Sequence, residues 1–346
     1  MIPIMEREFV DKHQWMDRQE FMDIMVVAQT TPGIFAIDMA SHIGYKLRGV
    51  WGGIVGALGI ALPSIIAIMV IAMFFQNFKD NEYVAKFFRG VRPAVVALIA
   101  APCFKMAKTA NITWRTAWIP VACAALIWLL GVSPIYHHSC RLGRISLWNV
   151  EFKARKMIFL KLFMIFTKIG TFNFGGGYAM LSLIHNETVV KNAWLTNSEF
   201  TDIVAISQST PGPIGINAAT YVGYTAVLNH GYPEWMAMIG SVLASLSIIW
   251  LPFIILILIS RYLMTHRDSK VVKSVFAGLR PAIIGLIAAA SLLLMTKDNF
   301  GSPKDEPIGF GISVALFAVT FFLTRYRKTN PILVMLCCGV LGLLVF

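Results

Sequence analysis

The amino-acid sequence predicts an all-α polytopic membrane protein made of two homologous repeats with broken or re-entrant helices. Hydrophobic residues fill 57% of the 346 positions and charged residues only 14%, whereas globular proteins carry about 25% charge. Several apolar runs approach the ~20 residues that cross a bilayer. The second half of the chain also repeats the pattern of the first. The number of apolar runs excludes a soluble protein with a single core.

The runs expected to lie in the bilayer are residues 52–75, 94–105, 118–132, 236–259, 282–295 and 308–323. The basic residues fall between these runs and give a net charge of +12, from 30 Lys and Arg against 18 Asp and Glu. Basic loops of this kind face anionic lipid, so the charge indicates a lipid bilayer as partner and not nucleic acid. The five cysteines have no metal-ligand spacing, and no cofactor is expected.

Two stretches align between the halves of the chain. Residues 20–45 match 199–224 at an offset of 179, with twelve of 26 positions identical, and residues 88–94 match 276–282 at an offset of 188. This alignment predicts a first repeat at 1–136, a basic connecting segment at 137–156 and a second repeat at 157–346. Met1 falls opposite Met180, so the first repeat is expected to be N-terminally incomplete. Residues 136–148 are too polar to span lipid, and either a cytoplasmic linker or a sequence lesion would explain them.

Loop charges predict how the repeats face. In the second half, loops 261–280 and 325–328 hold eight Lys and Arg, whereas the alternate loops 225–235 and 297–307 hold two. The positive-inside rule therefore puts the first pair of loops in the cytoplasm. In the first half the Lys and Arg bias is weaker, and it predicts that the equivalent loops face the opposite side of the membrane. We therefore expect the two repeats to be inverted relative to each other.

Each repeat is interrupted at the same place by proline and glycine, at residues 31–33 and 210–213. Proline removes a backbone donor and disfavours helix in the residue before it, so a helix should end there and another begin. The N-terminus of the new helix carries free N–H groups and a positive dipole end, which suits an oxyanion. In lipid, such a break survives only where it is buried or lines a watery cavity. Membrane proteins with internal repeats and matching broken helices are typically secondary transporters, with the site between the halves.

A triple glycine at 175–177 forms a further break after the apolar run 157–172. Its N–H groups can form an anion-binding nest, although small residues also allow close helix crossings. Amides beside the breaks can bind substrate or bridge helices. Asp38 takes the place of Asn217 and is a candidate for proton coupling, or alternatively a helix-bridging or water-facing carboxylate. Arg92 and Arg280 each precede a proline, and each can bind an oxyanion or anchor its helix at the headgroups.

The predicted substrate-binding residues are Gly175, Gly176, Gly177, Gln208, Thr210, Pro211, Gly212, Pro213, Asn217, Arg280, Gln29, Thr31, Pro32, Gly33 and Arg92. No phosphate-binding loop follows the triple glycine, since the Lys-Ser/Thr pair that it requires is missing. We therefore expect an ion gradient or the membrane potential to supply the energy for transport, and not ATP.

These motifs resemble the chromate ion transporter family in its two-domain form. The first half lacks the glycine run and has Ile34 where Pro213 lies, so the resemblance is more specific in the second half. It implies a multi-pass carrier of the bacterial plasma membrane that exports chromate, with sulfate as a related tetrahedral dianion. The residues that carry the resemblance are Lys168-Ile169-Gly170, Phe174 to Gly177, Gln208, Thr210 to Pro213, Asn217 and Gly223-Tyr224.

The residues alone leave other functions open. A transporter of another inorganic anion, such as sulfate, fits the same motifs. A membrane-embedded enzyme acting on lipid phosphate needs paired carboxylates or a His-Asp pair at helical spacing, and only the isolated Asp38 is present, so no enzyme is expected. A channel would need a ring of pore-lining charge, and a remnant without transport activity is a further alternative. The sequence is compatible with a homodimer.

Overall fold

Helices make up the regular structure in the part of the chain that the computed structural model describes, which is residues 1–346 without 1–4, 6, 18–19, 22–23, 26–27, 29–30, 79–80, 110–117, 131–157, 174–176, 267–269 and 328. No strand occurs among these described residues. In chain order the elements are η1 (Arg7–Lys12), α3 (Phe35–Phe78), α4 (Glu82–Thr109), α5 (Trp118–Leu130), α7 (Ile158–Thr171), α8 (Gly177–His185), η2 (Asn186–Lys191), α9 (Asn197–Ser209), α10 (Ile214–Asn229), α11 (Glu234–His266), α12 (Lys270–Leu293), α13 (Lys297–Phe300), α14 (Pro307–Phe322), η3 (Leu323–Arg327) and α15 (Pro331–Val345), where η marks a π-helical turn.

Four stretches of the described chain are long and apolar enough to cross a membrane, and they lie in α3, α4, α11 and α14 with the adjoining η3. Shorter apolar helices occur in α5, α12 and α15. Large hydrophobic side chains such as Trp51, Leu258 and Ile308 are exposed on the outside of these helices. Such exposure is unfavourable in water and natural in lipid. The predicted all-α polytopic membrane fold is confirmed.

The helix labelled α3 is in fact two antiparallel arms joined by a sharp turn at Gly49, whose φ is +61°. The turn places Gly44 against Gly52, so close that a Cβ on Gly44 would strike the backbone of Gly52. Helices α10 and α11 form the equivalent hairpin, in which Gly223 lies against Gly240. Small residues at the same two positions therefore set the crossing of both hairpins.

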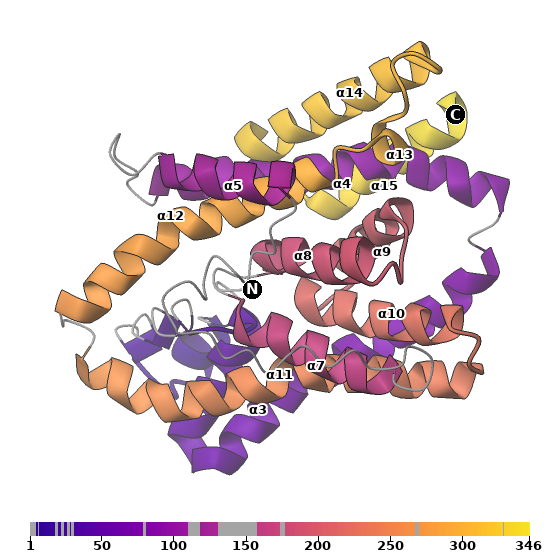
Figure 1. Ribbon diagram of the computed structural model, residues 1–346. Helices are drawn as coiled ribbons and strands as arrows, with labels where there is room; N and C mark the ends of the chain where they lie inside the picture. The colour runs from indigo at the N-terminus through magenta and orange to yellow at the C-terminus, as the bar shows by residue number, and fades with distance from the viewer. Residues whose placement is uncertain are drawn as a thin grey trace.

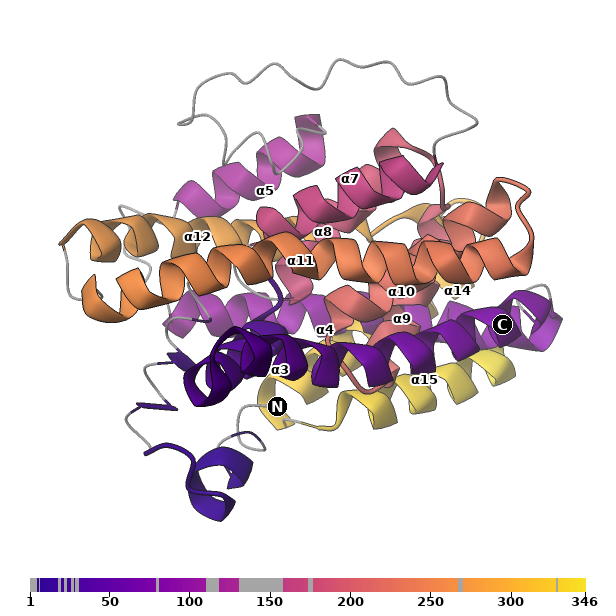
Figure 2. The same cartoon turned by 90° about the horizontal axis from the view of Figure 1, so that it is seen from below.

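The two repeats also share details of backbone conformation. Turns η1 and η2 lie 179 positions apart, and the residues that follow them, Gln14 and Ala193, have positive φ values of 50° and 47°. The amides of Trp15 and Trp194 then donate to the carbonyl six residues earlier, at 2.9 and 2.8 Å. Equivalent long helices run in opposite directions: in Figure 2, the arm of α3 that follows Gly49 runs from left to right and α11 from right to left. The repeats are inverted, as the loop charges predict.

The helices form two layers with α8 and α9 between them (Figure 1). One layer contains α3, α7, α10 and α11, and the other contains α4, α5, α12, α14 and α15. The last helices are exchanged between repeats, because α5 of the first repeat packs on α12 of the second, while α14 and α15 pack on α4. Each repeat therefore completes the other. The predicted connecting segment at 137–156 lies outside the described residues.

Candidate substrate-binding site

The break between α9 and α10 is a short extended segment. Thr210 ends α9 in an extended conformation, Gly212 has a φ of +123°, and Pro213 precedes the first turn of α10. No side chain caps α10, so protein side chains do not satisfy its first N–H groups. The hydroxyls of Ser209 and Thr210 donate back to carbonyls of α9, at 2.9 and 2.7 Å. The predicted new half-helix is confirmed.

Asn217 ties this break to the other repeat. Its buried side-chain amide donates to the carbonyls of Ser207 and Thr210, at 3.1 and 3.4 Å, and its Oδ1 accepts a hydrogen bond from Ser64 on α3. Gly212 packs at the same point, where a Cβ would lie 2.8 Å from the Cβ of Ser64. The break of the second repeat therefore rests on the long helix of the first.

The break of the first repeat mirrors this arrangement. Gly33 has a φ of +137°, and a Cβ there would lie 2.7 to 2.8 Å from the carboxylate oxygens of Asp38 and 3.0 Å from Pro252 on α11. Asp38 is the counterpart of Asn217 at the offset of 179, and Ser64 is the counterpart of Pro252 at the offset of 188. Each break thus faces the equivalent point on the long helix of the other repeat.

A third break, between α7 and α8, meets the first two. Its Asn173 accepts a hydrogen bond from the amide of Gly33 at 2.9 Å and donates its own side-chain amide to the carbonyl of Gly33. Helix α8 begins at Gly177, where a Cβ would lie 3.4 Å from the first side chain of α10, that of Ile214. The N-termini of α3, α8 and α10 therefore gather around one region inside the molecule.

Several side chains at this meeting point carry buried polar atoms without a hydrogen-bond partner among the described residues. They are both amide atoms of Gln208, the Oδ2 of Asp38 and the Oδ1 of Asn173. Buried polar groups in native proteins are generally paired with protein, water or ligand. The meeting point is thus both polar and only partly satisfied by the protein, as a substrate site requires.

The structure brings together most, but not all, of the predicted site residues. Residues 31–33, 38, 177, 208, 210–213 and 217 lie at or beside the meeting breaks. Gly175, Gly176, Gln29 and the side chain of Arg280 lie outside what the structure describes. Arg92 lies elsewhere, on α4, where it binds Asp202 of α9.

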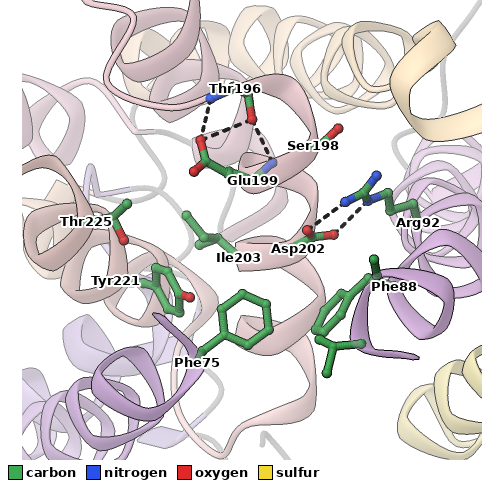
Figure 3. Close-up of a pocket in the computed structure, with 12 residues that line it drawn as sticks. Phe75, Phe88, Arg92, Thr196, Ser198, Glu199, Asp202, Ile203, Tyr221 and Thr225 are labelled. Carbon is green, nitrogen blue, oxygen red and sulfur yellow. Dashed lines mark hydrogen bonds and ion pairs between the residues drawn. The ribbon is translucent and has the colours of Figure 1, made fainter. Parts of the chain in front are cut away.

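The ion pair of Arg92 and Asp202 borders a cavity of about 260 Å3 (Figure 3). The ring of Phe75 stands between those of Phe88 and Tyr221, with centroids 5.1 and 6.2 Å apart, and forms one wall. Asp202 precedes Thr210 by eight residues, so the pair is about 12 Å from the break along α9. The cavity is lined by Phe75, Val84, Ala85, Phe88, Arg92, Thr196, Ser198, Glu199, Asp202, Ile203, Tyr221 and Thr225.

Three residues of this region were missed by sequence reasoning: Ser64, Asn173 and Asp202. A usable signal existed for Asp202, because Asp23 repeats it at the offset of 179 while Arg280 repeats Arg92. An acid and a base that both recur in a repeat are candidates for a pair. Neither Ser64 nor Asn173 recurs as the same residue in the other repeat, so only the fold identifies them.

Inverted repeats whose discontinuous helices meet inside the molecule are typical of membrane transporters. The chain belongs to the chromate transporter family, whose family model matches residues 1–142 and 160–343. The family assignment and the apolar helices together make it a multi-pass bacterial membrane protein.

Curated relatives cover nearly the whole chain. A chromate transport protein of Pseudomonas aeruginosa is 25% identical over 100% of this chain and 87% of its own length, and an uncharacterized transporter of Methanocaldococcus jannaschii is 26% identical over 97% and 87%. An uncharacterized transporter of Bacillus subtilis is 28% identical, with 98% of its length matched by 55% of this chain. That match has the size of one repeat. No solved structure matches the chain.

Proposed function

We propose that the chain is a secondary transporter that exports chromate, and that the oxyanion binds where the three breaks meet. The observation that carries this proposal is the docking of each Pro-Gly break on the long helix of the other repeat, with buried polar atoms left unpaired beside the breaks. Three helix N-termini point their N–H groups and positive dipole ends into this region, which favours an anion. The chromate transport proteins among the relatives supply the substrate class.

The two breaks differ in charge, and this difference suggests how transport is coupled. Asp38 is 2% exposed and lies in the first turn of α3, where its carboxylate compensates the positive end of that helix. The equivalent Asn217 is neutral, so the N-terminus of α10 is the end free to attract an anion. We assign proton coupling to Asp38, because its protonation would make the α3 end equally attractive to the oxyanion.

Sulfate is the alternative substrate, because it shares the charge and tetrahedral shape of chromate. Backbone N–H groups and amide side chains recognise oxygen atoms and charge, and neither differs between the two anions. A site of this construction is expected to accept both, with selectivity set by size alone.

The experiment is chromate uptake by everted membrane vesicles, in which export appears as accumulation. Vesicles that contain the chain should accumulate chromate, and an excess of sulfate should compete if the site accepts both. The matched variant is Gly212→Val, whose side chain would occupy the break against Ser64. Equal uptake by the wild-type and variant proteins, at equal membrane levels, would show that the transported anion does not bind at this break. Uptake of sulfate but not of chromate would identify sulfate as the substrate.

The coupling assignment has its own measurement. Asp38→Asn converts the first break to the amide of the second, so exchange of chromate across the membrane should continue while uptake driven by a proton gradient is lost. Gradient-driven uptake that survives in Asp38→Asn would remove Asp38 from this role.

A further inference from the structure

The ion pair of Arg92 and Asp202 joins α4 of the first repeat, in one layer, to α9 of the second repeat, which lies between the layers. Nε of Arg92 lies 2.8 Å from Oδ1 of Asp202, and Nη2 lies 2.8 Å from Oδ2, so the guanidinium binds the carboxylate with both arms of its fork. Nη1 also donates to the carbonyl of Asp298, at 3.4 Å. The two side chains are only 17% and 12% exposed. Both residues line the cavity shown in Figure 3.

The cavity beside the pair has room for a substrate. Its volume of about 260 Å3 is many times the roughly 10–15 Å3 that holds one water molecule. Four residues that carry hydroxyl groups, Thr196, Ser198, Tyr221 and Thr225, are among those that line it. Tyr221 follows the first residue of α10 by seven positions, or about 10 Å. The cavity therefore lies beside the start of α9 and the middle of α10, away from the meeting point of the breaks.

The two carboxylates of the cavity differ in how firmly they are held. Glu199 accepts hydrogen bonds from the amide and hydroxyl of Thr196, at 2.9 and 3.1 Å, and thereby caps the start of α9. Asp202 has no such structural task within α9, and its hydrogen-bond partner among the described residues is Arg92. Asp202 is thus the carboxylate that can leave its partner without unwinding a helix.

We propose that Arg92 is a transit site for a tetrahedral dianion, which displaces the carboxylate of Asp202 from the same guanidinium fork. The inference rests on the proposed function, since it places a second binding step on the route to the breaks. A carboxylate and a chromate or sulfate ion each present two oxygens to such a fork, and the dianion carries the larger charge. Asp202 keeps Arg92 paired between transport events, which avoids the cost of a buried unpaired charge. Its displacement releases the tie between α4 and α9.

A second ion pair on α4 provides a matched control. Arg89 lies one turn before Arg92, pairs with Glu306 and stacks over the ring of Phe346 at 4.6 Å. These two charged side chains are 37% and 52% exposed, and neither lines the cavity. The same charge changes can therefore be made on the same helix, away from the proposed site.

The test measures the KM for chromate in proteoliposomes that contain Arg92→Lys, Asp202→Asn, Arg89→Gln or Glu306→Gln. Loss of the fork in Arg92→Lys should raise KM about tenfold, and loss of the internal competitor in Asp202→Asn should lower KM about tenfold. The two control variants should stay within about twofold of the wild type. A purely structural tie predicts that Arg92→Lys and Asp202→Asn change KM in the same direction or not at all, and either result overturns the proposal.

A separate readout keeps this test independent of the transport assay. Thermal unfolding of the purified full chain in sulfate or chromate reports binding, since a ligand of the folded state raises the midpoint. As with KM, Arg92→Lys should raise the apparent Kd and Asp202→Asn should lower it. If the two variants show these shifts in affinity but the wild-type protein moves no chromate, the proposed function is refuted and the transit site stands. Equal sulfate affinity in Arg92→Lys and Asp202→Asn would refute the transit site even if chromate is exported.

Discussion

Alanine at Gly212 tests whether the two repeats dock at their breaks. The φ of +123° is a backbone conformation that a side chain strains, at a cost of about 1–3 kcal/mol. The added Cβ would lie 2.8 Å from the Cβ of Ser64 and 3.3 Å from Oδ1 of Asn217, so α3 or Asn217 must move. Overpacking of this kind costs about 1–3 kcal/mol. We expect Gly212→Ala to lower the free energy of unfolding by about 2–6 kcal/mol in all and to abolish chromate transport.

The control variant is Gly231→Ala. Gly231 also has a positive φ, +80°, but no atom lies within 4 Å of the position where its Cβ would be. Alanine there carries backbone strain without a collision, and the expected loss is about 1–2 kcal/mol. Because Gly231 lies in the loop after α10, transport should continue.

The double variant Gly212→Ala with Ser64→Gly isolates the contact between repeats. Removing the Ser64 side chain takes away the atoms that collide with the new Cβ, while glycine in the middle of α3 costs about 0.5–1 kcal/mol. The two changes should therefore be coupled, with the double variant more stable than the sum of the single losses by at least about 1 kcal/mol.

Denaturant unfolding in detergent gives the stabilities, and initial rates of chromate uptake in proteoliposomes give the activities. Two results would refute the reasoning. One is a Gly212→Ala variant as mild as Gly231→Ala, and the other is strict additivity of positions 64 and 212. Either would mean that the break of the second repeat does not rest on α3.

Three further predictions concern the architecture. Gly285→Leu should cost about 1–3 kcal/mol or more, because its Cβ would lie 2.6 Å from that of Cys123 on α5, whereas Gly311→Leu, with no atom within 4 Å, should be nearly neutral in the same unfolding assay; equal losses would contradict the packing of α5 on α12. Cysteines placed at Lys46 and Asn229 in a cysteine-free background should be labelled from opposite sides of the membrane, and labelling from one side would exclude inverted repeats. Glu187→Gln should destabilise by about 1–3 kcal/mol, because this buried carboxylate pairs with the partly exposed Lys168 and Lys191 at 3.2 and 2.8 Å, while the equivalent, more exposed Glu8→Gln should cost about 1 kcal/mol at most; comparable losses would argue against burial as the cause.

Local chemistry made the breaks predictable from the sequence. Proline and glycine act on the residues beside them, so residues 31–33 and 210–213 marked helix ends without knowledge of the fold. The offset of 179 also carried over to backbone details, such as the positive φ values at Gln14 and Ala193. Repeats and breaks were therefore accessible to sequence reasoning, and so was the inverted arrangement through the loop charges.

The docking between repeats was not predictable in this way. The contacts of Ser64 with Asn217 and of Gly33 with Pro252 join residues far apart in sequence, and no periodic pattern encodes such a pairing. The packing of α5 of the first repeat on α12 of the second was equally unpredictable from the sequence, because an apolar helix can be buried by any apolar partner. Arg92 was grouped with the substrate residues by its chemistry, and the structure shows that a carboxylate already holds it, about 12 Å from the break along α9.

The inverted repeats give two nearly equivalent breaks, and two differences between them, Asp38 for Asn217 and Pro252 for Ser64, underlie the proposed coupling. A site with two identical halves would attract an anion equally at both helix ends and would offer nothing for a proton to change. Asp38 in place of Asn217 makes one half negative, and Pro252 in place of Ser64 removes the hydroxyl that would otherwise bind it. The carboxylate is therefore left with an unpaired oxygen at the position where its counterpart is held by α3. In the proposed function, symmetry thus builds the anion site, and this local asymmetry supplies the group whose charge would change during transport.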